Sequence, residues 1–349
     1  MATFNGSLNV NKIFKSAELT GVLYNMIISQ EVFADNVKGT DLVDQARVDG
    51  GLLGDTKLFY ATDALESRVW GDPDSADTNN VLAPEARGTV KTQAITLDKF
   101  RQIGVRIDNY LTKQAFADEG TFSAFNSVML GWLRDTKKVY DGTTYNCYIG
   151  TTTGAAQQSN KTVDATDGKT IANGLADIIT EMTDYNRDYN DYGFLRRYSE
   201  DEIKVIFNAK YINKITNVDL PVIFDNAGLK ATFSKEKLPA KYFGAVNAEA
   251  TQGDGSKVRS LVEQKIGSNH YFAGDLIDVS DTAPAGTSYT QDDNIICKIL
   301  VKLPPYMSAF EVGTSFFNPK SLTENHYLTF GHNTIEYLQA YPMVTVKKA

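Results

Sequence analysis

The spacing of apolar residues predicts both helices and strands along this chain. Apolar residues recur at steps of three and four in three segments, which predicts one helix from about Ser16, a long helix over residues 121–140 and another over residues 171–185. Runs of alternating or β-branched apolar residues predict strands. These strands are expected at residues 57–61, 95–107, 204–207, 222–224, 271–279, 295–303, 327–330 and 343–346. The mixture predicts an α+β fold.

The helix over residues 121–140 has the clearest periodicity. No proline occurs between Pro84 and Pro221, so this helix is not interrupted. Its apolar positions form one stripe, which we expect to face a core. The stripe consists of Phe122, Phe125, Met129, Trp132, Leu133, Thr136 and Tyr140.

Long polar stretches separate the apolar segments. They span residues 71–90, 151–167, 247–257 and 281–294, and a polar arm precedes the first helix. Loops longer than about 12 to 15 residues are uncommon inside compact domains and tend to be functional or disordered. Several such loops in one chain indicate a protein that reaches outward and is ordered by its neighbours, which predicts assembly.

Composition narrows the possible classes of protein. The chain is 42% hydrophobic and contains 18 Tyr, 18 Phe and 2 Trp residues, which excludes wholesale disorder. A net charge of −8 argues against a main role in gripping phosphate backbones. Cys147 and Cys297 lie too far apart in sequence to indicate a disulfide framework or a zinc knuckle, so a reducing compartment fits best. Neither a signal peptide nor a membrane span is indicated.

Sequence motifs for catalysis or cofactor binding are missing. No phosphate-binding loop, dinucleotide fingerprint or GxSxG elbow occurs. His326 and His332 are six positions apart, a spacing that does not suit a metal pair. Residues 184–195 begin like a calcium loop, but Tyr189 and Leu195 stand where the turn glycine and the bidentate glutamate belong. We therefore predict no catalytic residues, no cofactor and no metal.

The order of the segments resembles that of the major capsid protein of tailed bacteriophages, the Hong Kong 97 fold. Residues 95–111 (ITLDKFRQIGVRIDNYL), followed by a helix containing RDTKKVYDG at 134–142, resemble the family's extended loop and spine helix. Residues 204–215 (KVIFNAKYINKI) are similar to a strand and short helix of its axial domain. The segments AGDLIDVSD at 273–281 and YLQAYPMVTVKK at 337–348 resemble strands that complete the axial and peripheral domains.

The resemblance implies a division of the chain into five parts. It predicts an N-terminal arm and helix, an extended β-hairpin loop, the spine helix with the start of a peripheral domain, a mainly axial domain, and closing strands of the peripheral domain. These parts correspond to residues 1–53, 54–108, 109–165, 166–294 and 295–349. The stripe of the spine helix is expected to pack on the sheet of the peripheral domain.

The resemblance also implies a structural role without an active site. Such a chain forms pentamers and hexamers that close into an icosahedral shell around double-stranded DNA, which is enclosed without sequence-specific contact. Residues 71–90 are then expected to lie over a neighbouring subunit, with Trp70 as an apolar anchor and Glu85 and Arg87 as candidates for charge pairs between subunits.

The resemblance implies partners and a location as well. The expected partners are copies of the chain, a portal and a scaffolding protein, which is expected to be separate because the arm begins within about fifteen residues of Met1. The expected location is the virion, after assembly in the bacterial host cytoplasm and without a membrane. A covalent crosslink through Lys57 or Lys91 is left open.

Two alternative functions are left open. An encapsulin-type nanocompartment has a related shell fold, but it would need a surface that binds cargo. A cytosolic α+β enzyme with an unrecognised site would need a pocket containing paired titratable groups of shifted pKa.

Overall fold

The structure is a computed structural model that describes most of the chain after residue 40. The described residues are 41–50, 55–65, 67, 87–108, 119–151, 161–212, 236–246, 263–266, 269–272, 289–333 and 335–349. The predicted helix from Ser16 and the predicted strand at 222–224 lie outside the described residues, as do residues 71–86 of the first long polar stretch.

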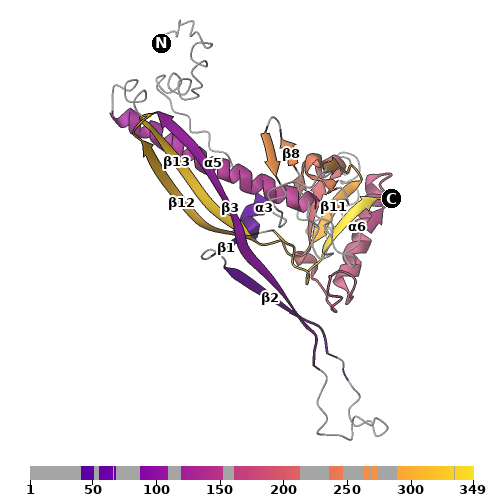
Figure 1. The fold of residues 1–349 in the computed structure, drawn as a ribbon. Helices are drawn as coiled ribbons and strands as arrows, with labels where there is room; N and C mark the ends of the chain where they lie inside the picture. The colour runs from indigo at the N-terminus through magenta and orange to yellow at the C-terminus, as the bar shows by residue number, and fades with distance from the viewer. Residues whose placement is uncertain are drawn as a thin grey trace, which may run out of the picture.

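The longer of two five-stranded sheets lies alongside the longest helix (Figure 1). Its strand order is β1-β12-β13-β3-β2, and only β1 is parallel to its neighbour. A short helix, α3 (Asp41–Ala46), runs directly into β1. The strands are β1 (Arg47–Asp49), β2 (Thr56–Thr62), β3 (Val90–Asp108), β12 (Tyr306–Asn318) and β13 (Thr323–Asn333).

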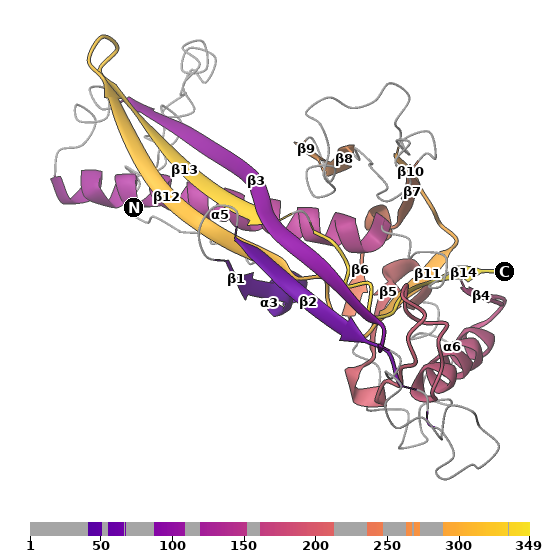
Figure 2. The same cartoon turned by 60° about the horizontal axis from the view of Figure 1, so that its bottom comes forward.

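Strand β3 is 19 residues long and takes two partners in succession. Its first part pairs with β2, from Val90 opposite Thr62 to Thr96 opposite Thr56. Its second part pairs with β13. The β2–β3 hairpin therefore extends from one end of the long sheet (Figure 2), and the strands predicted at 57–61 and 95–107 are confirmed.

Helix α5 (Glu119–Thr151) packs beneath β3 and β13 and is longer than predicted. Leu133 forms a cluster with Leu328 and Phe330 of β13. The predicted stripe is wrong at Trp132, whose side chain is 46% exposed. One residue corresponds to about 100° of rotation around a helix, so burial of Leu133 turns Trp132 away from the sheet.

The shorter five-stranded sheet has the order β4-β14-β11-β5-β6. All six residues of β11 are buried, because helices cover both faces of this sheet. The end of α5 packs on one face and helix α6 (Gly168–Thr183) packs on the other (Figure 1). The strands are β4 (Lys161–Val163), β5 (Lys204–Asn208), β6 (Glu236–Leu238), β11 (Ile295–Leu300) and β14 (Met343–Lys348).

Helix α6 confirms the helix predicted over residues 171–185. Asp167 caps its first turn by accepting a hydrogen bond from the Thr170 N–H at 2.8 Å, and the Thr170 hydroxyl accepts one from the Asp167 N–H in return. Leu175, Ile178 and Met182 are buried against the sheet, as their spacing predicted. The cap and the apolar stripe together explain where this helix begins and which face it buries.

Shorter elements complete the described part. They are the 3₁₀ helices η2 (Glu200–Glu202) and η3 (Ala240–Tyr242), and the strands β7 (Gly244–Val246), β8 (Glu263–Ile266), β9 (Asn269–Phe272) and β10 (Tyr289–Gln291). Strands β7 and β10 form one pair, and β8 and β9 form another. No described helix is long and apolar enough to cross a membrane.

The C-terminal part contributes to both sheets. Strands β11 and β14 lie in the shorter sheet, whereas β12 and β13 lie in the longer one. The strand predicted at 295–303 ends at Leu300, and the one predicted at 327–330 is longer at both ends. The proposed division of the chain into five parts stays a prediction.

Candidate interaction surface

The β2–β3 hairpin presents one face that carries no charge, called the outer face below. Alternate residues of a strand lie on one face, and cross-strand partners lie on the same face. The outer face consists of Thr56, Leu58, Tyr60 and Thr62 on β2 and Val90, Thr92, Ala94 and Thr96 on β3, all of them exposed. Leu58 is 53% exposed and Tyr60 is 68% exposed. Such a surface favours contact with another macromolecule over solvation.

The opposite face of the hairpin packs on residues 335–341 of the same chain. The Gln93 side chain is buried there; its Nε2 donates to the Tyr337 carbonyl and its Oε1 accepts from the Gln339 N–H, both at 2.9 Å. Ile95 belongs to a cluster that includes Leu338. These contacts cover much of the inner face of the hairpin, whereas the outer face stays exposed.

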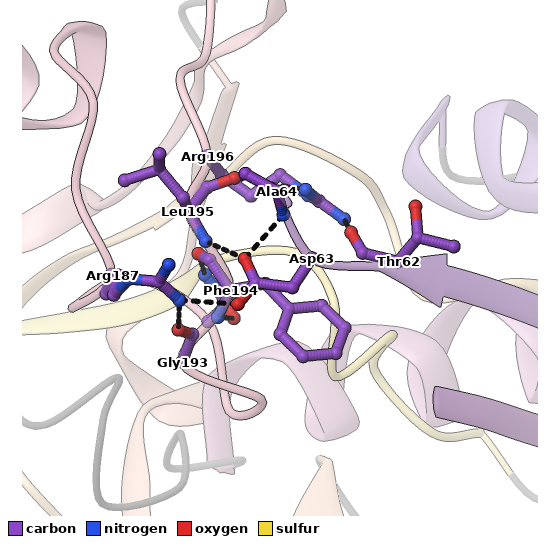
Figure 3. A network of polar contacts seen from close by, with 9 residues as sticks. Thr62, Asp63, Ala64, Arg187, Gly193, Phe194, Leu195 and Arg196 are labelled. Atoms are coloured by element: carbon purple, nitrogen blue, oxygen red, sulfur yellow. Dashed lines mark hydrogen bonds and ion pairs between the residues drawn. The ribbon is translucent and has the colours of Figure 1, made fainter. Parts of the chain in front are cut away.

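The Gln93 hydrogen bonds are one anchor of the hairpin, and a second anchor, at Asp63, holds it where β2 ends (Figure 3). One carboxylate oxygen of Asp63 accepts from the Arg187 guanidinium at 2.6 Å. The other oxygen accepts from the N–H groups of Leu195 at 2.9 Å and Ala64 at 2.8 Å. The Arg187 hydrogen bond, followed by the Leu195 N–H, lowers the pKa of Asp63 to about 2. Asp63 is thus ionised and held at neutral pH.

The anchor works because the loop that receives Asp63 is itself closed. Asn186 and Arg196 exchange two backbone hydrogen bonds across the base of the loop. Inside it, the buried Asn190 side chain bonds both the N–H and the carbonyl of Phe194. Gly193 has a φ of 66°, which favours glycine, and its carbonyl accepts from Arg187. This loop therefore gives the hairpin a rigid support.

Of the three predicted contact residues, Arg87 alone belongs to the described part of the chain. Trp70 and Glu85 lie outside the described residues. Arg87 is described and exposed, three positions before β3 begins. The roles of all three as contacts between subunits stay predictions. The uncharged outer face was not predicted from the sequence, although the alternation of Thr, Leu and Tyr in β2 could have indicated it.

A polar cluster lies where the chain passes from β11 to β12. The Tyr306 hydroxyl donates to Asp141 of α5 at 2.6 Å, and Lys137 lies 3.6 Å from Asp141 and 3.2 Å from Glu311. Arg47 also lies 3.6 Å from Asp141. Burial, followed by the Asp141 charge, raises the pKa of Tyr306. A cavity of about 270 Å³ adjoins this cluster and is lined by Arg47, Lys137, Asp141 and Glu311, among other residues.

His332 belongs to the same junction and is fully buried. Its Nδ1 is 2.9 Å from the Asn333 carbonyl, which can only accept, so Nδ1 carries the proton. Its Nε2 is 3.0 Å from the Tyr140 hydroxyl, and in the neutral ring it accepts a hydrogen bond from that hydroxyl. The ring stacks on Tyr306 at 5.7 Å. These contacts give His332 a structural role in joining α5 to the long sheet.

The other residues considered for chemistry are dispersed. His326 lies beside Glu324 on β13. Cys297 is buried in the shorter sheet, and burial raises the pKa of its thiol. Within the described residues, no group of three or more His, Cys, Asp or Glu side chains is placed to hold a metal ion.

Comparisons with known proteins support the fold. The sequence matches no protein-family model and no curated protein. A chain in the capsid structure of Staphylococcus phage Andhra is 10% identical, with a TM-score of 0.65 over 92% of this chain and 87% of that one. A chain in the structure of head fibre and inner core protein gp22 of native bacteriophage P68 is 10% identical, with a TM-score of 0.64 over 92% and 88% of the two chains. The chain has the Hong Kong 97-like α+β fold.

Proposed function

We propose that the chain is the major capsid subunit of a tailed bacteriophage. The observation that carries this proposal is the similarity of fold to a chain in a phage capsid structure, over nearly the full length of both. Fold alone does not define function, so a feature of the surface must support the proposal. The uncharged outer face of the hairpin provides that support.

The outer face suits repeated contact between subunits. Each copy carries a net charge of −8, so two copies repel one another overall. An uncharged face containing exposed Leu58 and Tyr60 offers a contact without that cost. The anchors at Gln93 and Asp63 hold this face in one orientation before any partner binds. A shell subunit needs such a prepared contact.

The finer features follow from the capsid role. The subunits form pentamers and hexamers that close into an icosahedral shell, and the shell encloses double-stranded DNA without sequence-specific contact. The partners are further copies of the chain, a scaffolding protein and a portal. The location is the virion, after assembly in the host cytoplasm.

Electron microscopy with light scattering tests this proposal. The purified chain, alone and together with candidate scaffolding proteins, is expected to form closed shells, tubes or rings of five or six subunits. Shells isolated from infected cells are expected to contain double-stranded DNA. A stable monomer or dimer under every condition would refute the proposal. Shells that contain a protein cargo instead would favour the nanocompartment.

A matched pair of variants tests the outer face. Tyr60→Asp places a charge on that face and is expected to reduce the yield of shells at least about tenfold, because a charge in a desolvated contact is costly. Tyr185→Asp is the control, since Tyr185 is 66% exposed and lies in the loop after α6. Equal yields from the two variants would exclude the outer face as a contact between subunits.

A further inference from the structure

Strand β12 lies at one side of the long sheet, and among the described strands only β1 pairs with it there, along its first residues. β1 pairs in parallel with Tyr306, Met307 and Ser308, and the Gly50 N–H then donates to the Ser308 carbonyl at 3.3 Å. From residue 309 onward, no strand of the described part lies on that side of β12. The edge thus already accepts one strand, and its continuation is open with respect to the described residues.

Beyond Glu311, the open part of β12 is exposed and lacks charge. Residues 312–318 (VGTSFFN) contain no ionisable side chain. Val312 and Phe316 lie on one face of the sheet and Phe317 lies on the other, and all three are exposed, Phe316 to 60%. A strand edge that is both long and apolar pairs readily with another strand.

The opposite edge of the same sheet provides an internal comparison. β3 pairs with β2 only over residues 90–96, so residues 98–108 have no described strand on the β2 side. That segment (DKFRQIGVRID) contains five charged residues, among them Lys99, Arg101 and Arg106. Charged residues, lysine above all, protect free edges from pairing. Residues 98–108 of β3 are therefore protected by charge, and residues 312–318 of β12 are not.

We propose that a strand of a second copy of this chain adds to the long sheet alongside residues 312–318 of β12. The inference rests on the proposed function, because a shell supplies many identical copies at close range. The uncharged edge also lets two copies of net charge −8 approach without bringing like charges together. Backbone hydrogen bonds hold the added strand, and Val312, Phe316 and Phe317 pack against its side chains.

Amide hydrogen exchange gives the most direct test. In an antiparallel edge strand, alternate residues direct their N–H groups toward the existing partner, and the others direct them toward solvent. Every second amide between residues 312 and 318 is expected to exchange at least about tenfold more slowly in shells than in the free subunit. The same measurement on residues 98–108 is the control, because strand addition at β12 predicts no slowing of alternate amides there when shells form.

Two variants test the role of charge at this edge. Thr314→Lys adds a charge to the exposed edge strand and is expected to reduce the yield of shells at least about tenfold. Gln102→Lys adds the same charge at an exposed position of β3, in the segment that already contains basic residues. It is expected to leave the yield of shells unchanged. The melting temperatures of the free subunits show whether both variants fold.

A photo-crosslinker at position 316 identifies the occupant. Phe316→p-benzoylphenylalanine is expected to give a covalent dimer of this chain in shells, and peptide masses then locate the added strand. A crosslink to a different protein would overturn the inference. Shells with unchanged exchange at residues 312–318 would overturn the inference and leave the proposed function standing. Failure of the wild-type chain to assemble at all would refute both.

Discussion

Replacing Lys298 with methionine is expected to stabilise the free subunit at neutral pH. Lys298 lies in the middle of β11 and is fully buried, and its Nζ donates to the Thr345 hydroxyl at 2.7 Å. Burial, followed by the nearby charge of Lys347, lowers its pKa to about 7. The amine therefore opposes folding at every pH at which the unfolded lysine is charged, because the folded chain must either bury that charge or release the proton.

The sign and size of the effect follow from proton linkage. The unfolded lysine has a pKa of about 10.4, so between about pH 7 and pH 10 the unfolded chain binds more protons. The free energy of unfolding then rises with pH, by up to about 1.4 kcal/mol per unit. From about pH 7 to pH 9 the gain is about 2 kcal/mol, because the buried amine is half protonated at the start. Below about pH 7 both states are protonated and the penalty stays constant.

Methionine keeps the length of the side chain and removes the charge. It is expected to raise the free energy of unfolding by about 3 kcal/mol at neutral pH, because it removes a penalty of about 4 kcal/mol and loses about 1 kcal/mol with the hydrogen bond to Thr345. Denaturant unfolding of the free subunit, followed by circular dichroism at about pH 6, 7, 8 and 9, measures both the gain and the slope.

Lys347→Met is the control for this prediction. Lys347 lies beside the same strands but is partly exposed and lies 3.2 Å from Asp292. That variant is expected to keep a rise of stability with pH, which begins at a higher pH because the charge of Lys347 no longer lowers the pKa of Lys298. Equal slopes in the wild-type chain and in Lys298→Met would refute the assignment of the pH dependence to a buried amine.

Two further predictions concern backbone packing and the hairpin anchor. Gly150→Ala is expected to destabilise the subunit by about 2 kcal/mol or more, because the added Cβ would clash with the Tyr242 carbonyl. In the same helix, a Cβ added at Gly131 has no neighbour within 4 Å, so Gly131→Ala is expected to stabilise the subunit by about 1 kcal/mol. Asp63→Asn is expected to cost about 1 kcal/mol at neutral pH and to remove a loss of stability that the wild type shows as pH falls from about 4 to 2.

Elements with a one-sided core could be predicted from the sequence. Helix α6 buries a single apolar stripe and begins at a polar cap, so periodicity located it. Strand β12 was missed for the opposite reason. Residues 311–317 are exposed, so no alternation of apolar and polar residues marks the strand. The aromatic pair at Phe316 and Phe317 before the turn was the signal that could have indicated it.

The inward face of α5 was predicted incorrectly because it contains charged residues. Lys137 and Asp141 are buried, paired with each other, and Lys137 also lies 5.4 Å above the Phe330 ring. A hydrophobic scale assigns such positions to the surface. Tertiary pairing reverses the assignment, and it leaves Trp132 exposed instead.

The anchor at Asp63 could not be predicted from the sequence, since Asp63 and Arg187 are 124 residues apart. Its effect on assembly is nevertheless physical and general. A contact surface that is already ordered loses little conformational entropy when a partner binds. The two anchors place hydrogen bonds and charge at the base and inner side of the hairpin, where water is partly excluded, and leave the outer face uncharged. The inner side of the hairpin thus fixes its orientation, and the outer face is available for contact. A partner can therefore bind the outer face without disturbing the hydrogen bonds of Gln93 and Asp63.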